Sequence, residues 1–453
     1  MNPQTGSLPP GPARSGWLAR VAARPRGWCF STYYAEGFPY TVIRILSALY
    51  ATDIGIKERV IGYMNFLALP WNLKFLWAPL LDLTGTKKRW MAGMQLAIGV
   101  AMLALGVLNF LEPGVLASGR VTHLIVVLVV LAVLAATQDV AIDAYYMEGL
   151  PDPSIQAAWA GYRTLAYRLA MVSVRSGLVA LAAVLVLLPG WTRFLAWGWT
   201  FVAAGLIMLA LGTFHGLFLP ECGKETAGER KRSPREILVG FGRAFLTYLE
   251  QDRVGLVLAF IVFYKVGDEV LFSMVTPFLK RELGVTLAQY AWISGVVGAA
   301  GMILGTTAGG LWIKRQGLKK AIWPLTLLMN TPIWIYVALA HFKPDPATGT
   351  GITLIALVHG IEQFASGLGS AALLVYLLST CKPEFKAAHY AVGSALMSVF
   401  ATFFGGFSGL IVEHFGYVRL FVSAFLLSIP AMVILCWLPI HSPPPKGASA
   451  PRA

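Results

Sequence analysis

The sequence has few charged residues and lacks the motifs of a soluble enzyme. Only 13% of its 453 residues are charged, about half of the roughly 25% that is usual in soluble domains. No G-x-x-x-x-G-K-[ST] or H-E-x-x-H pattern occurs, so ATP hydrolysis by this chain is excluded as an energy source. The four cysteines are far apart and form no C-x-x-C pair, which argues against a disulfide framework or a zinc site. We expect no cofactor, no metal and no catalytic residues.

Long apolar stretches occupy most of the chain. Apolar residues make up 57% of it, and a helix that spans a membrane needs about 20 of them in succession. Continuous apolar runs, unlike alternating ones, exclude a transmembrane β-barrel. The pattern predicts an all-α polytopic membrane protein with twelve transmembrane helices, at residues 28–51, 59–81, 90–111, 121–148, 158–188, 193–219, 254–280, 286–313, 319–341, 351–380, 386–412 and 417–440.

The distribution of positive charge predicts the orientation. The chain has 36 Lys and Arg against 22 Asp and Glu, a net charge of +14. Lys and Arg concentrate on the cytoplasmic side of membrane proteins. Here 22 of them lie in the two tails and the loops after even-numbered helices, eight lie in the opposite loops, and six lie inside spans. Both termini are therefore predicted to be cytoplasmic. The first 27 residues lack an apolar core and do not resemble a cleaved signal peptide.

The chain divides into two similar halves. The predicted domains are a cytoplasmic tail (1–27), a six-helix bundle (28–219), a cytoplasmic loop (220–253), a second six-helix bundle (254–440) and a second tail (441–453). Ile54-Gly55-Ile56 matches Leu283-Gly284-Val285 at an offset of 229, and Ala157-Ala158-Trp159 matches Ala387-Ala388-His389 at an offset of 230. Two parallel six-helix repeats with a midplane substrate site are the architecture of major facilitator transporters.

Several charged side chains lie inside the predicted spans. Such residues are costly in a membrane, and they usually pair with each other or line a water-filled cavity. Asp139 and Asp143 are four residues apart and share a helix face, so we expect one of the two carboxyls to hold a proton. Lys265 can pair with Asp268, three residues away, or with Glu36, its equivalent at an offset of 229. Each of these groups could instead be a structural brace between helices, and Lys74 could snorkel to the cytoplasmic surface.

Several motifs resemble those of the bacterial muropeptide permease AmpG and its relatives, a family that includes eukaryotic acetyl-coenzyme A transporters. They extend from about residue 30 to residue 430 and include Ala35-Glu-Gly-Phe-Pro39, Lys74-Phe-Leu-Trp-Ala-Pro-Leu-Leu-Asp82, Thr137-Gln-Asp-Val-Ala-Ile-Asp-Ala144 and Tyr264-Lys-Val-Gly-Asp268. The resemblance implies proton-coupled import of anhydro-muramyl peptides across the bacterial inner membrane for cell-wall recycling. Carried over by motif, it favours Gln138, Asp139, Asp143, Arg168, Lys265 and Asp268 as functional positions.

The remaining candidate residues are chosen for the chemistry of their side chains and for their positions inside the predicted spans. The predicted substrate-binding residues are Tyr34, Gln138, Tyr145, Arg168, Tyr264, Lys265, Asp268 and Glu362, and the predicted proton-coupling residues are Glu36, Asp139 and Asp143. Arg44 and Arg175 are charges beyond the AmpG pattern, as is Glu36. The expected partners are a small-molecule substrate, protons and membrane lipid, with no nucleic acid and no obligatory protein partner.

Three alternatives remain open at this stage. The cargo could be another anion such as an acyl-coenzyme A. The chain could also be a membrane sensor that transports nothing. A membrane-embedded acyltransferase would require a histidine near the membrane face, and this sequence offers only isolated candidates such as His359 and His389.

Overall fold

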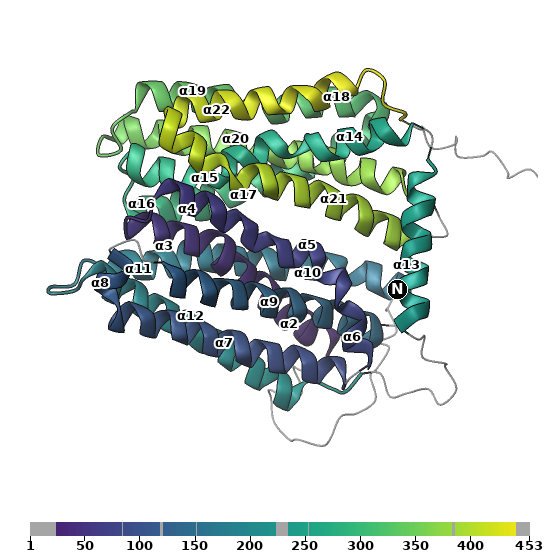
Figure 1. Ribbon diagram of the computed structural model, residues 1–453, viewed down its shortest axis with the longest axis horizontal. Coiled ribbons are helices and arrows are strands. Elements are labelled where there is room, and N and C mark those ends of the chain that lie inside the picture. The colour runs from purple at the N-terminus through teal and green to yellow at the C-terminus, as the bar shows by residue number, and fades with distance from the viewer. Residues whose placement is uncertain are drawn as a thin grey trace, which may run out of the picture. The chain divides into compact units, whose positions relative to one another are not determined.

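The computed structural model describes residues 24–83, 85–117, 121–150, 152–222, 234–251, 253–382 and 386–440, and every regular element within these ranges is helical (Figure 1). The chain forms two compact units. The first contains Met1–Ile237 together with Met274–Val296, and the second contains Leu238–Ser273 together with Val297–Ala453.

The helices follow the apolar stretches of the sequence. Up to the central loop they are α2 (Pro25–Thr41), η1 (Val42–Leu46), α3 (Ser47–Asp53), α4 (Glu58–Tyr63), η2 (Met64–Ala68), α5 (Leu69–Leu73), η3 (Lys74–Leu76), α6 (Ala78–Leu83), α7 (Lys87–Leu111), α8 (Pro113–Ala117), α9 (Thr122–Gly149), α10 (Pro153–Val172), η4 (Ser173–Leu178), α11 (Val179–Leu185) and α12 (Arg193–Phe218). They continue as α13 (Pro234–Leu249), α14 (Val254–Tyr264), α15 (Val266–Pro277), η5 (Phe278–Glu282), α16 (Leu287–Trp292), η6 (Ile293–Gly298), α17 (Ala299–Gln316), α18 (Leu318–Asn330), α19 (Ile333–Phe342), α20 (Gly349–Ser379), α21 (Lys386–Gly406) and α22 (Ser408–Ile434).

Eight helices in the described part of the chain are long and apolar enough to cross a membrane. They correspond to eight of the twelve predicted spans. The predicted spans at 28–51, 59–81, 254–280 and 386–412 are also helical, but each of them is divided into shorter segments. The second predicted span is the most broken, because 3-10 turns separate α4, α5 and α6. Lys74 and Lys265 lie at such breaks, Lys74 at the start of η3 and Lys265 between α14 and α15, whereas Glu36 lies within the regular helix α2.

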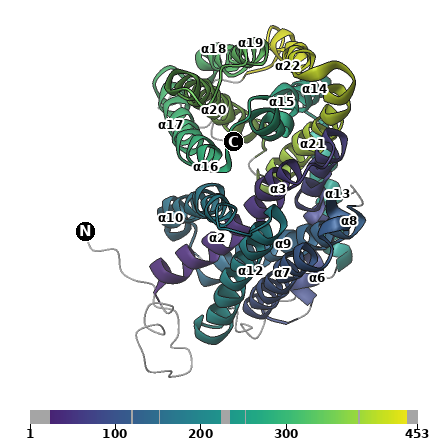
Figure 2. The ribbon, with the colours of Figure 1, turned by 90° about the vertical axis from the view of Figure 1, so that its left-hand side faces the viewer.

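In the first unit, α7 packs between α9 and α12 (Figures 1 and 2). The contact of α7 with α12 depends on glycine, because a Cβ on Gly205 would lie 2.8 Å from the carbonyl oxygen of Gly99, and one on Gly106 would lie 2.8 Å from that of Gly198. Small residues of this kind allow membrane helices to approach closely. A second contact is polar: buried His215 of α12 bonds Gln95 of α7 through Nδ1 at 2.6 Å and Ser31 of α2 through Nε2 at 3.0 Å.

The segment Met274–Val296 belongs to the first unit through ion pairs with the end of α3 and the start of α4. Lys280 Nζ lies 3.1 Å from Asp53 Oδ1, and Arg281 Nη1 lies 2.7 Å from Glu58 Oε1. Arg281 also donates to the carbonyl oxygens of Thr52 and Ala51. These bonds connect residues that are more than 220 positions apart in the sequence, and they explain why this segment groups with the first unit.

Two turns support the predicted internal repeat. Gly55 and Gly284, which the offset of 229 aligns, both have positive φ, at 90° and 74°. Side chains with a Cβ rarely adopt this conformation. Each glycine follows a helix end and precedes the next predicted span. The same backbone turn therefore recurs at the aligned position of each half.

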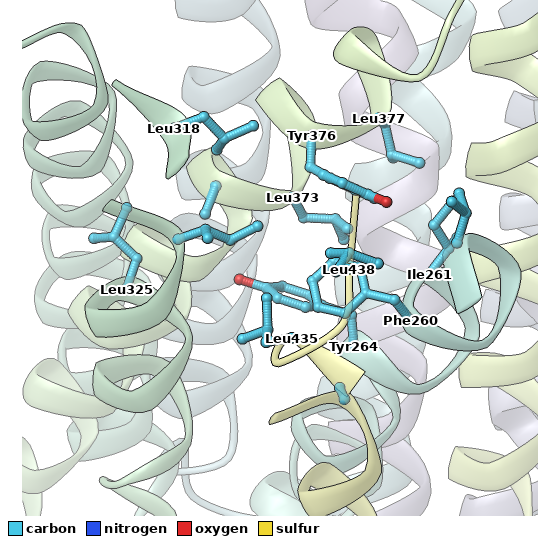
Figure 3. Packing of buried hydrophobic residues seen from close by; sticks show 14 of the residues in the cluster. Phe260, Ile261, Tyr264, Leu318, Leu325, Leu373, Tyr376, Leu377, Leu435 and Leu438 are labelled. Atoms are coloured by element: carbon cyan, nitrogen blue, oxygen red, sulfur yellow. The ribbon is translucent and has the colours of Figure 1, made fainter. Parts of the chain in front are cut away.

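In the second unit, a hydrophobic cluster fills the space between α14, α18, α20 and the end of α22 (Figure 3). Phe260 and Tyr376 are fully buried, and their ring centroids lie 5.0 Å apart at an interplanar angle of 78°. Tyr264 and Leu435 both belong to this cluster, and the Tyr264 hydroxyl donates to the carbonyl oxygen of Gly369 at 3.0 Å. This packing fixes the end of α14, immediately before Lys265.

The glycine stripe 301–305–309 is a helix-packing face, as its spacing indicates. A Cβ on Gly301 would lie 2.7 Å from the carbonyl oxygen of Gly360, and one on Gly309 would lie 2.9 Å from that of Leu368. A Cβ on Gly305 would overlap the carbonyl of Phe364. The stripe therefore brings the backbone of α17 against that of α20, the helix that carries Glu362 and Ser366.

We expect Gly305→Val to destabilise the second unit, because its side chain would force α17 away from α20. Overpacking of this kind costs about 1–3 kcal/mol. The measurement is the thermal unfolding midpoint of the purified protein in detergent. The matched control is Gly310→Val on the same helix, where an added Cβ meets no atom within 4 Å. Equal midpoints for the two variants would contradict the assignment of the stripe to packing.

Candidate functional site

A cluster of charged side chains lies among α2, η3, α9 and α10 in the first unit. Lys74 Nζ is 2.5 Å from Asp139 Oδ2. The lysine begins η3, a short 3-10 turn after α5, and the aspartate lies on the long helix α9. The Lys74 side chain is 31% exposed and that of Asp139 is 12% exposed. Lys74 is thus directed to a carboxylate on a neighbouring helix and does not snorkel.

One turn further along α9, Asp143 has a different cation. Arg163 of α10 donates from Nη2 to Asp143 Oδ1 at 2.9 Å, and the Tyr33 hydroxyl donates to the same oxygen at 2.8 Å. The Arg163 guanidinium also lies over the rings of Tyr33 and Tyr146, at 4.2 Å and 4.5 Å from their centroids. Cation–π contacts add to the attraction in such partly desolvated sites. The Asp143 carboxylate and the two tyrosine rings therefore hold the Arg163 guanidinium together.

Glu36 is the third carboxyl of this cluster. Its carboxyl lies beside that of Asp139 and close to Asp143 and Lys74. Its Oε2 atom is buried and accepts no hydrogen bond from the described residues. Three carboxyls therefore share two cations, Lys74 and Arg163. With every group ionised, one negative charge would remain uncompensated, and a single proton on the cluster removes it.

Asp139 and Asp143 lie on one face of α9, as predicted, and each contacts a cation of its own. The expectation that one of these two carboxyls holds a proton stays a prediction. Glu36 is the excess carboxyl of the cluster, because the structure gives it no ion pair with a described residue. Lys74 and Arg163 were absent from the predicted site. The sequence does show that Lys74 and Arg163 are charged residues inside predicted spans. The spacing of residues along one helix, however, does not show which other helix provides the cation for each carboxylate.

The structure brings only some of the predicted ligands to this cluster. The Tyr34 hydroxyl shares a hydrogen bond of 2.8 Å with Ser173 of η4. Gln138 is fully buried and donates to the carbonyl oxygen of Ala35 at 2.6 Å, while its Oε1 lacks a partner among the described residues. Tyr145 is fully buried against Trp28 and donates to the carbonyl oxygen of Pro220 at 2.9 Å. These contacts give Tyr145 a packing role in α9, so cargo binding by it stays a prediction without geometric support.

A second, smaller cluster lies in the second unit. Lys265 follows α14, and its Nζ lies 2.6 Å from Asp268 Oδ2 and 3.4 Å from Ser366 Oγ of α20. Ser366 also donates to Asp268 Oδ2 at 3.0 Å. Lys265 thus pairs with Asp268, one of its predicted partners. Glu362, one turn from Ser366, is 2% exposed, lies near both charges and accepts from Gln363 Nε2 at 3.2 Å.

The second cluster repeats the charge imbalance of the first. Asp268 and Glu362 supply two carboxyls, and Lys265 supplies one cation. Tyr264, although adjacent to Lys265, points its hydroxyl to the backbone of Gly369 and accepts from Thr326 Oγ1 at 3.5 Å. Tyr264 therefore belongs to the packing shown in Figure 3, and its role as a ligand also stays a prediction.

Comparison with known protein families shows what kind of protein the chain resembles. Residues 258–453 match the model of the Major Facilitator Superfamily, and residues 37–163 match the model described as Acetyl-coenzyme A transporter 1. The two matches fall on different halves of the chain. The chain is thus similar to the major facilitator superfamily over residues 258–453 and to a transporter family over residues 37–163. It is a multi-pass membrane transporter, and its substrate is a small molecule.

The relatives show that the chain is AmpG-like. The Anhydromuropeptide permease of Escherichia coli is 26% identical over 407 residues, with 89% of this chain and 77% of that protein covered. A protein of Rickettsia felis named Putative transporter AmpG 4 is 25% identical over 413 residues, covering 89% of this chain and 94% of the relative. The resemblance in the sequence motifs is thus confirmed at the level of the family.

Solved structures show the same fold. A bacterial homologue of the human lysosomal transporter Spinster matches with a TM-score of 0.67 at 16% identity, covering 93% of this chain and 97% of that one. This identity is low, so the match shows the fold and carries no information on cargo. It confirms the predicted major facilitator architecture.

Proposed function

We propose that this major facilitator transporter imports anhydro-muramyl peptides across the bacterial inner membrane for cell-wall recycling, coupled to protons and working by alternating access. The observation that carries the proton coupling is the excess carboxyl, Glu36, among Lys74, Asp139, Asp143 and Arg163. A proton on Glu36 makes the cluster neutral in total, and its loss makes it negative. Polar groups at this depth are costly unless they serve a transport pathway.

Cargo recognition would use the groups that the structure leaves able to bond. A muropeptide carries several carboxylates, sugar hydroxyls and amides. In the first unit, Arg168 would attract a carboxylate, and Oε1 of Gln138 would accept a hydrogen bond from an amide or hydroxyl. In the second unit, Lys265, which contacts Asp268, would attract a carboxylate. Support for this cargo comes from the permease of Escherichia coli, whose name states it.

The deciding experiment is uptake into proteoliposomes. The purified protein should concentrate a radiolabelled anhydro-muramyl tripeptide when the outside is acidic, and it should only equilibrate the label when the two sides have equal pH. Liposomes without protein and the same liposomes with a protonophore are the controls. Accumulation that does not depend on the pH gradient would contradict proton coupling. If the label does not move at all, the proposal that a muropeptide is the cargo is wrong.

A second cargo has one specific observation in its favour. The match to the model described as Acetyl-coenzyme A transporter 1 covers residues 37–163, which include Lys74, Asp139 and Arg163 and begin directly after Glu36. Labelled acetyl-coenzyme A is therefore the competing substrate in the same assay. A chain that moves neither cargo, nor any other anion, would favour the membrane sensor.

Topology provides an independent test of the proposed location. The excess of Lys and Arg in the tails and even-numbered loops predicts cytoplasmic termini. Reporter fusions after Lys88, Lys231 and Lys319 should all report the cytoplasm, whereas a fusion after Lys343 should report the opposite side. A single fusion that reports the wrong side would contradict the predicted number of twelve spans.

A further inference from the structure

Two arginines of the fifth predicted span have no anionic partner in the part of the chain that the structure describes. Arg168 lies on α10 and Arg175 on η4, and neither forms an ion pair or a side-chain hydrogen bond with a described residue. The Nε of Arg175 is buried. The other cations of the charged clusters differ, because Lys74, Arg163 and Lys265 each contact a carboxylate within 3 Å.

Three tyrosines and a second arginine, and no acid, lie near Arg175: Tyr40, Tyr167, Tyr290 and Arg168. Tyr40 is held between Trp71 and Tyr167, with ring centroids at 5.1 Å and 6.3 Å. The Tyr290 hydroxyl shares a hydrogen bond of 2.9 Å with Thr276. Arg175 itself forms no cation–π contact or hydrogen bond through its side chain with the described residues, so its N–H donors are available to a ligand.

The backbone around Arg175 is fixed on both sides. Ser173 bonds the Tyr34 hydroxyl at 2.8 Å, and Ser176 Oγ donates to the carbonyl oxygen of Ala291 at 3.0 Å. The π-helical segment η4 also packs closely on η6, since a Cβ on Gly295 would overlap Ser176. Short π-helical segments inside α-helices occur frequently at functional sites. Here one of them holds an unpaired cation in a set position.

We propose that Arg168 and Arg175 form a subsite for two oxyanion groups of a single cargo molecule, with Arg175 selecting cargo that carries the second group. This inference rests on the proposed function and adds a specificity-determining residue to it. Seven residues of helix rise by about 10 Å, which suits two separate acidic groups better than one. Guanidinium groups bind carboxylate and phosphate alike, so the two oxyanions can come from a peptide or from a nucleotide-type cofactor.

The test compares ligands that differ in acidic groups. The probes are an anhydro-muramyl tripeptide with free carboxylates, the same compound with one free carboxylate and the others amidated, and acetyl-coenzyme A. Affinity for the purified protein is measured by competition with a labelled probe. For Arg175→Gln we expect a loss of about 10–100-fold for the probe with several free acids, as for one charged hydrogen-bonded contact. The affinity of Arg175→Gln for the compound with one free carboxylate should differ from that of the wild type by less than about threefold.

Two comparisons separate recognition from structure. Arg175→Gln removes an unpaired charge, so its unfolding midpoint should equal or exceed that of the wild type, whereas loss of a structural brace would lower it. Arg175→Lys should regain part of the affinity. Arg419→Gln on the exposed face of α22 is the control and should leave all affinities unchanged.

The outcomes distinguish this inference from the proposed function. If Arg175→Gln weakens both tripeptide probes equally, or neither, the two-anion subsite is rejected. If the wild type binds only acetyl-coenzyme A and that binding depends on Arg175, the muropeptide function fails, while the subsite stands with phosphates as its ligands. If the wild type binds none of the three probes, both are rejected.

Discussion

Glu36→Gln should abolish accumulation of cargo against its gradient while leaving exchange of cargo across the membrane intact. The substitution keeps the size of the side chain and imitates its protonated form permanently. The cluster then has two carboxylates, Asp139 and Asp143, and two cations, Lys74 and Arg163, and it no longer changes charge during the cycle. A carrier that cannot release the proton can move cargo only downhill.

The size of the effect follows from the driving force. One proton per cargo gives about a tenfold accumulation for each pH unit across the membrane. In proteoliposomes with an acidic exterior, the wild type should therefore reach this ratio and Glu36→Gln should stay at a ratio near one. In counterflow, unlabelled internal cargo exchanges for labelled external cargo without a pH gradient. The rate of this exchange in Glu36→Gln should stay within about tenfold of the wild-type rate.

Two further variants locate the coupling site. Glu112→Gln, which changes an acid that bonds exposed His123 at 3.0 Å, should behave as the wild type. Asp139→Asn removes the carboxylate that Lys74 contacts directly, so it should lower stability as well as transport. If Glu36→Gln still concentrates cargo while Glu362→Gln does not, proton coupling belongs to the second unit.

The fold could be predicted from the sequence because it depends on long apolar runs and on the side of the membrane that carries Lys and Arg. The close approach of α17 to α20 was also predictable, since glycines four residues apart have no side chain to separate two helices. These signals are local. They depend on neighbours in sequence or on one helix face.

The site was predicted less well because its pairings join helices that are distant in the sequence. Asp139 and Asp143 were placed on one face correctly, yet their cations come from residues 65 and 20 positions away. Tyr145 and Tyr264 were chosen for their chemistry, and the structure directs their hydroxyls to backbone carbonyls. Arg175 was noted only as an additional charge. Its lack of an acidic neighbour is visible in three dimensions alone.

Lys265→Met should both destabilise the second unit and weaken cargo binding. In the wild type Lys265 compensates Asp268 at 2.6 Å, with Glu362 nearby. Without the ammonium, two acidic groups share a buried site with no cation. Removing one partner of a buried ion pair costs about 3–5 kcal/mol, which should appear as a clear drop of the unfolding midpoint. Lys382→Met is the control in the same unit. Its pair with Glu250 is exposed and 3.5 Å long, and such pairs contribute about 0–1 kcal/mol.

The double variant Lys265→Met with Asp268→Asn separates a ligand from a brace. It removes both charges of the pair, so the unfolding midpoint should return close to that of the wild type. If Lys265 attracts a carboxylate of the cargo, this restored protein should still show no thermal stabilisation by the tripeptide, because the attracting charge is absent. If the double variant is stabilised by cargo as strongly as the wild type, Lys265 is a brace only. Recognition of the acidic group would then fall to Arg168 and Arg175 in the first unit.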